Sequence, residues 1–274
     1  MTGAHVAAMI ILGLRLGLYK ALAGAGPVTS DVLAEATKLR ERWLREWLRG
    51  QATAGIVEYR GDERFELSAE AALLLVDEDS LSYLGANFLH LPDRMAMLEQ
   101  LQQSFRTGIG YSLDDRGAAA AEASGQQFAN WHRQALVPMA LPMLDGVVAR
   151  LETGAVAADV GCGSGVAVIE MAKAFPRSRF HGYDTSRHAL ALAEANRATA
   201  RVENASFHDP SSEPLPTDAS VDFITTFDCL HDMTRPEDVV AAIRAAIKPD
   251  GVWFIVDING APTFEEQLGR ANAP

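Results

Sequence analysis

The sequence predicts an α/β fold, in which a parallel sheet with helices on both faces follows a helical N-terminal region. From residue 155 onward, short apolar segments alternate with helical patterns, as in parallel strands joined by crossover helices. A turn with three glycines, residues 161–165, separates the first apolar segment from the first helical pattern. The 274 residues, 48% hydrophobic and 22% charged, allow one large folded domain or two smaller ones.

The N-terminal region is expected to form three helices. Apolar residues at three- and four-residue steps predict a helix over 5–23, which ends in a Gly- and Pro-rich stretch. A second helix is expected over 31–37, capped by Thr29 or Ser30, and a third over 41–52. The side chains expected to face the core in the second and third helices are Val32, Leu33, Ala36, Trp43, Leu44, Trp47 and Leu48.

Two short alternating segments, 56–59 and 64–67, flank Gly61-Asp62 and predict a β-hairpin. Three helices followed by a hairpin make a winged helix, a fold that often binds DNA. Four arginines lie in the third helix or directly before it (Arg40, Arg42, Arg45 and Arg49), but so do two glutamates, and the wing tip is acidic. Together with the net charge of −12, this favours a dimerisation and substrate-covering module over DNA binding.

The middle of the chain is expected to be helical. Helices are predicted over 69–110, and a long helix over 126–151 is interrupted by Pro138 and Pro142. Large side chains along it either pack in the core or wall a pocket: Phe128, Trp131, Met139 and Met143. The expected parts of the chain are a winged-helix domain over 1–80, a helical linker that covers the substrate over 81–150, and an α/β domain over 151–274.

The α/β domain is expected to hold a ligand at the glycine turn, because ligands bind at the carboxyl ends of parallel strands. The predicted strands are 157–160, 180–183, 221–226 and 252–258, and the predicted helices are 166–174, 187–198 and 236–247. Glycines let the backbone approach a ligand, and the helix that follows attracts an anion. Asp184 ends the second strand and can accept hydrogen bonds from a ribose diol. Val166 stands where a dinucleotide loop needs its third glycine, which argues against an NAD-type site.

The spacing Asp159-x-Gly161-x-Gly163-x-Gly165, with Gly182-Tyr183-Asp184 and Lys248-Pro249-Asp250-Gly251 downstream, resembles the class I S-adenosylmethionine-dependent methyltransferases. Segments 14–19, 41–54 and 227–233 are similar to a bacterial subgroup of small-molecule and O-methyltransferases with an N-terminal winged helix. The resemblance implies a Rossmann-like domain that uses S-adenosyl-L-methionine as its cofactor. It also implies transfer of a methyl group to a small-molecule acceptor.

The resemblance assigns roles by position. Asp159, Gly161 and Gly163, with Cys162 in the same turn, are expected at the methionine part of the cofactor. Asp184 would bind the ribose hydroxyls, Thr185 the adenosine, and Phe227 would lie beside the cofactor near the reacting centre. The acid that reads the adenine is displaced here, so either Asp209 or Ser211 takes that place, and we favour Asp209.

The family fold normally continues after the fifth strand with a helix and two more strands. This chain ends at Pro274, so the C-terminal strands are expected to be missing. The sequence is then either a fragment or truncated form, or the sheet is completed differently. An open sheet edge would be an aggregation liability or a partner surface.

His231 is the candidate for chemistry, since the His231-Asp232 pair resembles the general-base site of small-molecule O-methyltransferases. It is either the base for an acceptor hydroxyl or a residue that only shapes the pocket. His90, His181, His188 and His208 are expected to be structural or surface residues. The spacing of Cys and His residues does not suggest a metal site.

We expect a cytoplasmic homodimer that acts on a small molecule and binds neither nucleic acid nor membrane. Cys162 and Cys229 make no disulfide framework, which indicates a reducing compartment. The apolar run 6–18 contains Arg15 and is too short to span a bilayer. The alternatives are a winged-helix transcription regulator that senses S-adenosylmethionine and a catalytically silent cofactor-binding protein.

Overall fold

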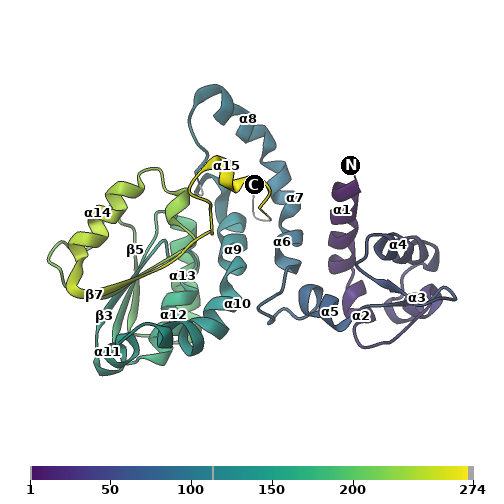
Figure 1. The fold of residues 1–274 in the computed structure, drawn as a ribbon, viewed down its shortest axis with the longest axis horizontal. Coiled ribbons are helices and arrows are strands. Elements are labelled where there is room, and N and C mark those ends of the chain that lie inside the picture. Colours follow the sequence, from purple (N-terminus) through teal and green to yellow (C-terminus); the bar gives the residue numbers. More distant parts are fainter. Residues whose placement is uncertain (1, 113, 271–274) are drawn as a thin grey trace. The chain divides into compact units, whose positions relative to one another are not determined.

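The computed structural model describes residues 2–112 and 114–270 (Figure 1). The chain divides into two compact units, Met1–Tyr111 (unit 1) and Ser112–Pro274 (unit 2).

Unit 1 begins with a winged helix. Its elements are α1 (Thr2–Arg15), α2 (Leu18–Leu22), α3 (Ser30–Thr37), α4 (Glu41–Thr53), β1 (Glu58–Tyr59) and β2 (Phe65–Glu66). The two strands pair antiparallel, and Val28 adds a further bridge to Phe65, so the predicted hairpin is confirmed. The Tyr19 hydroxyl donates to Gln51 Oε1 over 2.5 Å inside an apolar core that also contains Leu33 and Leu48.

The structure corrects the predicted first helix. It is broken at Gly17, where φ is +69°, so that α1 and α2 are separate helices. The left-handed conformation costs glycine little, and a turn there redirects the chain. Of the two candidate caps for α3, Thr29 Oγ1 accepts from the Val32 N–H.

Three predicted core residues of α3 and α4 are exposed. Val32 is 50% and Trp43 76% exposed, and Ala36 also faces solvent. The core side of α4 consists instead of Leu44, Trp47 and Leu48. These three follow the i, i+3, i+4 spacing of one helix face, and Trp43 lies about 100° round the helix from Leu44.

The rest of unit 1 is helical, as predicted. Its helices are α5 (Ala69–Leu75), α6 (Gly85–Leu89), α7 (Leu91–Ala96) and α8 (Leu98–Thr107). Helices α7 and α8 bury none of their residues, and several of their apolar side chains face solvent.

Unit 2 contains the predicted parallel sheet. Its strands are β3 (Val156–Val160), β4 (Arg179–Tyr183), β5 (Ala205–His208), β6 (Val221–Phe227) and β7 (Ile247–Val256). They are ordered β5-β4-β3-β6-β7, and each neighbouring pair is parallel. The crossover helices are α12 (Val166–Ala174), α13 (Arg187–Ala200) and α14 (Pro236–Ala246). Residues 209–220, all of which the structure describes, connect β5 to β6 without a helix.

The predicted long helix over 126–151 is a succession of shorter elements. Unit 2 starts with η1 (Asp114–Arg116), α9 (Gly117–Gln127), α10 (Ala129–Trp131), η2 (His132–Ala140), η3 (Leu141–Met143) and α11 (Val147–Thr153). Segment η2 is a π-helix that contains Pro138, and η3 begins beside Pro142. Proline lacks an N–H and clashes with the preceding turn, which accounts for the breaks. After β7 the structure describes one short helix, α15 (Phe264–Gln267).

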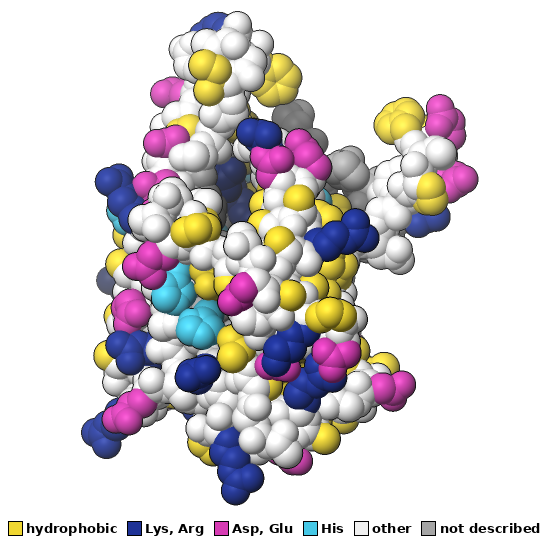
Figure 2. All heavy atoms as spheres, turned by 90° about the vertical axis from the view of Figure 1, so that its left-hand side faces the viewer, with side chains coloured by type: hydrophobic (Ala, Val, Ile, Leu, Met, Phe, Trp, Pro, Cys, Tyr) yellow, Lys and Arg dark blue, Asp and Glu magenta, His cyan; other side chains and the backbone are white. Residues whose placement is uncertain are grey.

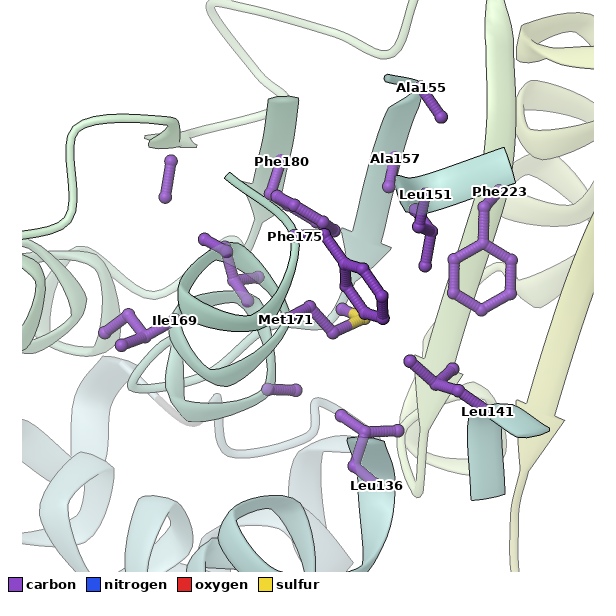
Figure 3. Packing of buried hydrophobic residues seen from close by; sticks show 14 of the residues in the cluster. Leu136, Leu141, Leu151, Ala155, Ala157, Ile169, Met171, Phe175, Phe180 and Phe223 are labelled. Carbon is purple, nitrogen blue, oxygen red and sulfur yellow. The ribbon is translucent and has the colours of Figure 1, made fainter. Parts of the chain in front are cut away.

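The sheet of unit 2 separates two hydrophobic clusters. Ala157 and Phe223 point to the larger cluster, whereas Ala158 and Ile224 point to the smaller one, because successive strand residues face opposite sides. Figure 3 shows Met171 of α12 in the larger cluster, with Leu136, Leu141, Leu151, Phe175 and Phe180 around it. These contacts fix the strands whose carboxyl ends form the candidate site.

Among the described residues, a single helix with the length and apolar character for crossing a bilayer is not found. One bent pair, Ala129–Met143 with Val147–Thr153, meets those criteria only when both parts are taken together.

Candidate functional site

Acidic residues gather at one edge of the unit 2 sheet. An aspartate directly follows each of four strands: Asp184 after β4, Asp209 after β5, Asp228 after β6 and Asp257 after β7. The glycine turn follows β3. Since all five strands are parallel, these groups share the carboxyl edge, where α/β sheets bind their ligands.

The glycine turn leaves β3 and leads into α12. Gly161, Gly163 and Gly165 have φ values of 81°, 52° and 75°. The N–H groups of Gly161 and Cys162 both donate to the Tyr183 carbonyl, over 2.8 and 3.0 Å. A Cβ built at Gly163 would meet nothing within 4 Å, so the turn is open at this residue. The backbone can therefore approach a ligand here.

Asp184 ties the turn to the end of β4. Its Oδ2 accepts from the Gly163 N–H over 2.8 Å and its Oδ1 from the Ser186 N–H over 2.9 Å. Burial raises the pKa of this carboxyl, and the backbone hydrogen bonds partly oppose the shift. Each carboxylate oxygen has a further lone pair, so Asp184 can also accept from a ribose hydroxyl.

Asp159 lies beneath the turn. It is only 2% exposed, and its Oδ1 accepts from Thr225 Oγ1 on β6 over 2.7 Å. Burial raises its pKa to about 7. In this structure the side chain therefore faces the neighbouring strand, and the open side of the turn is formed by backbone.

Cys162 also points inward. Its side chain is 8% exposed, and burial raises the pKa of its thiol well above the usual value, which keeps it neutral. A Cβ at Gly182 would lie 2.8 Å from the Cys162 Sγ and 2.5 Å from a Phe207 ring carbon. Cys162 can thus meet a ligand only through its backbone.

The structure places the candidates for the adenosine end at the ends of β4 and β5. Thr185 is exposed beside Asp184. Asp209 Oδ1 accepts from the Ser211 N–H over 2.8 Å, so the two alternatives for adenine recognition belong to one turn. Hydrogen bonds from Ser211 lower the pKa of the Asp209 carboxyl.

Phe227, at the end of β6, is part of an aromatic cluster. It is 8% exposed, and its ring lies 5.6 Å from Trp131, 4.9 Å from His132 and 5.9 Å from Phe254 between centroids. Burial lowers the pKa of His132 to about 4, so the imidazole is neutral. Within the described residues, the buried His132 Nε2 has no hydrogen-bond partner.

His231 lies in η4 (Leu230–Asp232), between the ends of β6 and β7. Its Nδ1 is 2.5 Å from Asp257 Oδ1 and 4.0 Å from Asp228 Oδ1. Burial alone would lower the pKa of His231, but the hydrogen bond and charge of Asp257, with Asp232 and Asp228, outweigh it and raise the pKa. The backbone of Asp228 has a φ of +50°, in the left-handed region that Asp adopts more readily than most non-glycine residues.

Helix α9 packs directly on the glycine turn. A Cβ at Gly125 would lie 2.3 Å from Ser164 Oγ and 2.8 Å from Ser164 Cβ. Asn196 of α13 donates to the Ser164 carbonyl over 3.0 Å. Two helices, α9 and α13, therefore contact the turn at Ser164.

Sequence reasoning missed three contributors to this edge: Asp257, His132 and Gly125. Asp257 directly follows an apolar strand, and in the sequence only this position could have indicated a place at the carboxyl edge of the sheet. His132 lies in a stretch that is typical of core packing, and Gly125 follows an Ala-rich patch. The structure brings Asp159, the glycines, Asp184, Asp209, Phe227 and His231 to the same sheet edge.

The described groups fit S-adenosylmethionine. An open glycine backbone, a carboxylate next to it and a second acidic turn match an amino-acid end, a ribose and an adenine in that order. The neighbouring His231–Asp257 pair can accept a proton.

Two family models match the chain. A model described as a methyltransferase domain matches residues 151–272, and one described as an Rv2258c-like winged HTH domain matches residues 4–76. Mitomycin biosynthesis 6-O-methyltransferase from Streptomyces lavendulae is 31% identical over 278 aligned residues, covering 94% of this chain and 75% of that protein.

Solved structures agree with these matches. The structure of the mitomycin 7-O-methyltransferase has a TM-score of 0.63 and 27% identity, covering 96% of this chain and 80% of that one. Human N-acetylserotonin methyltransferase in complex with S-adenosylmethionine has a TM-score of 0.66 and covers 98% of this chain and 80% of its own, but at 17% identity this shows the fold alone. The fold, the domain matches and the relative together show that this chain belongs to the methyltransferase family that includes mitomycin biosynthesis 6-O-methyltransferase.

Proposed function

We propose that this methyltransferase transfers the methyl group of S-adenosylmethionine to a hydroxyl oxygen of a small-molecule acceptor. The observation that carries the proposal is the bond between His231 Nδ1 and Asp257 Oδ1, beside the glycine turn. The names of the relatives, which are O-methyltransferases, support oxygen as the atom that receives the methyl group.

The cofactor would supply an electrophilic methyl group on a sulfonium centre. The backbone of Gly161–Gly163 would hold its amino-acid end, and Asp184 its ribose hydroxyls. Asp209, or Ser211 in the same turn, would meet the adenine, with Thr185 nearby. Asp159 would act through Thr225, by fixing β3 against β6 below the turn.

His231 would act as the general base. Its Nδ1–H donates to Asp257, which leaves the Nε2 lone pair to accept the proton of the acceptor hydroxyl. The raised pKa makes the imidazole a stronger base than free histidine. Holding the hydroxyl in line with the methyl group supplies the remaining acceleration through orientation.

The aromatic cluster would form one wall of the acceptor pocket. Phe227 and Trp131 offer apolar ring faces. The neutral His132 adds a buried nitrogen, Nε2, that has no hydrogen-bond partner among the described residues. A polar group of the acceptor would satisfy it, which removes a cost of about 1–3 kcal/mol for an unpaired buried group.

We further propose that the protein is cytoplasmic and that two copies of the chain form a dimer through unit 1. Apolar side chains of this unit face solvent, among them Leu12 at 44%, Leu16 at 49% and Phe105 at 91% exposure. We propose that these side chains contribute to the contact between two copies of the chain. Sedimentation of the full chain as a dimer is the expected result.

Observations on α4 disfavour the transcription-regulator alternative. Arg42 pairs with Glu46, Arg45 with Glu41, and Arg49 with Glu63 of the wing. This pairing cancels much of the positive charge that DNA phosphates would require.

Calorimetry with S-adenosylmethionine and S-adenosylhomocysteine tests the cofactor, and release of S-adenosylhomocysteine with a panel of phenols tests turnover. We expect binding that Asp184→Ala weakens and Asp250→Ala, an exposed carboxylate elsewhere, leaves unchanged. Failure to bind at millimolar cofactor would overturn the proposal. Binding without turnover of any acceptor would favour the silent cofactor-binding protein.

A further inference from the structure

One side chain joins the glycine turn to the loop that carries His231. Strands β3 and β6 pair with each other as far as Asp159 and Thr225, and beyond these residues each strand is paired only with its other neighbour. The two carboxyl ends therefore separate, as at the switch point where parallel sheets hold ligands. Cys229, two residues after β6, spans the gap, because its Sγ lies 3.2 Å from the carbonyl oxygen of Val160 at the end of β3.

The same side chain packs on the first glycine of the turn. A Cβ built at Gly161 would lie 2.7 Å from the Cys229 Sγ and 2.8 Å from the Cys229 Cβ. The turn itself has further supports on the β4 side, where the Gly161 N–H donates to the Tyr183 carbonyl and the Gly163 N–H to Asp184. The turn would therefore stay attached to β4 if the Cys229 thiol were removed.

The backbone of Cys229 leads directly into η4. Its carbonyl accepts from the Asp232 N–H over 3.2 Å, and the preceding Asp228 N–H donates to the Val256 carbonyl of β7 over 2.7 Å. The loop is thus held to β7 by its backbone and to β3 by the Cys229 side chain. The position of Cys229 against the turn therefore sets the position of His231, two residues further on.

The sulfur of Cys229 acts as a hydrogen-bond donor. Burial, then the charges of Asp159 and Asp257, raise the pKa of the thiol to about 12. The group therefore keeps its proton at neutral pH and can donate it to the Val160 carbonyl. A protonated thiol is a weak nucleophile, which favours a role in geometry over a role in chemistry.

We propose that Cys229 is a positioning residue for methyl transfer, which holds η4, and with it His231, at a fixed distance from the glycine turn. The inference rests on the proposed function, because this distance matters only if the turn holds the methyl donor and His231 takes the proton of the acceptor. Misplacing reacting groups by about 1 Å can lower a rate by about 100-fold. A side chain that spans the gap between donor and base therefore controls the rate without touching the acceptor.

Cys229 acts on the position of His231 and leaves its pKa unchanged. Burial lowers that pKa, and the hydrogen bond and charge of Asp257, with Asp232 and Asp228, outweigh the effect. Farther out, acidic and basic side chains are intermingled on the face drawn in Figure 2, so their fields at a distance largely cancel. We therefore expect variants of Cys229 to keep the acid limb of the kcat–pH profile at the wild-type pH.

The test is steady-state kinetics of the full chain with the phenol that it methylates fastest, together with calorimetry for S-adenosylmethionine. Cys229→Ala should lower kcat about 10-fold or more and leave the Kd of the cofactor unchanged. Cys229→Ser keeps a donor for the Val160 carbonyl and should restore most of the wild-type kcat. The control is Thr199→Val, which removes a hydrogen bond of 2.9 Å to the Ala195 carbonyl on the exposed side of α13 and should match the wild type. Thermal denaturation checks that each variant is folded.

Four outcomes would overturn this inference and leave the proposed function intact. They are a wild-type kcat in Cys229→Ala, an equal loss in the Ala and Ser variants, a loss of kcat matched by a loss of cofactor affinity, and a displaced acid limb. A wild-type chain that methylates no phenol, or an unchanged kcat in His231→Ala, would instead overturn the proposed mechanism and this inference with it.

Discussion

His231 and Asp257 form the pair on which turnover depends in the proposed mechanism. His231→Ala should lower kcat about 10²- to 10⁴-fold, because the acceptor hydroxyl loses its base, and should leave the affinity for S-adenosylmethionine unchanged. Asp257→Asn should lower kcat and move the acid limb of the kcat–pH profile to lower pH, since loss of the carboxylate lowers the pKa of His231. Steady-state kinetics and calorimetry measure both effects.

A surface carboxylate serves as the control for that pair. Asp238→Asn in α14 changes a half-exposed side chain that pairs with Arg235, and we expect wild-type kinetics. An unchanged kcat in His231→Ala would exclude His231 from the chemistry and leave it a role in shaping the pocket.

Asp159 predicts a pH dependence of stability. Its folded pKa of about 7 exceeds the ordinary value of 3.8, so the folded chain keeps this proton over a pH range in which the unfolded chain has lost it. The unfolding free energy therefore falls as pH rises from about 4 to 7, by up to about 1.4 kcal/mol per pH unit from this group.

Asp159→Asn should remove this decrease, so that the unfolding free energy depends less on pH. Urea unfolding at about pH 5 and about pH 7 measures it, with Asp250→Asn, an exposed carboxylate, as the control that keeps the wild-type slope. Equal slopes in wild type and Asp159→Asn would show that the buried carboxyl titrates normally.

At the scale of elements, helix α9 leaves no room for a side chain at Gly125, where it contacts the glycine turn. Gly125→Ala should weaken S-adenosylmethionine binding and lower the Tm, because the new Cβ would press on the Ser164 side chain and displace the turn. Gly50→Ala in α4 is the matched control. Nothing lies within 4 Å of that Cβ, so we expect a gain of about 0.5–1 kcal/mol from helix propensity.

Thermal denaturation and calorimetry measure both glycine variants. Wild-type cofactor affinity in Gly125→Ala would mean that α9 can move away from the turn without cost to the site.

The order of elements in unit 2 was predictable because short apolar strands and amphipathic helices alternate regularly. The helices of unit 1 were predictable in kind but less so in their faces, as the exposed Val32 and Trp43 show. An apolar side chain is buried only if another element covers it. Which element does so depends on the tertiary fold and cannot be predicted from the neighbouring residues. The break at Gly17 likewise depends on the chain's path after α1.

The candidate site was predictable where it is local in sequence. The glycine turn and Asp184 lie close together in the chain and have a recognisable spacing. The partner of His231 could not be predicted from the sequence. Asp257 becomes its neighbour only through the strand register that pairs Phe227 with Val256. His132 was missed for the same reason, since its contact with Phe227 joins a π-helix to a strand 95 positions later (227 − 132).

At the scale of the molecule, the two units predict two unfolding events. The proposed cofactor groups belong to unit 2, so S-adenosylhomocysteine should raise only the transition of that unit, by roughly 5 °C or more at about 100-fold excess over Kd. The fluorescence of Trp131 and Trp253 reports on unit 2 when Trp43 and Trp47 of unit 1 are replaced by Phe.

Calorimetry of the full chain provides the independent measurement. One transition that moves as a whole with the ligand would show that the units unfold together, against the expectation.

The aspartates that follow β4, β5, β6 and β7 concentrate negative charge at one edge of the sheet. With the proposed chemistry, the donor brings a sulfonium charge to this edge, whereas the thioether left after transfer is uncharged at sulfur. The edge therefore attracts the fresh donor more strongly than the spent one. We expect S-adenosylhomocysteine to bind this edge more weakly than S-adenosylmethionine, and the difference between the two dissociation constants to shrink as the ionic strength rises.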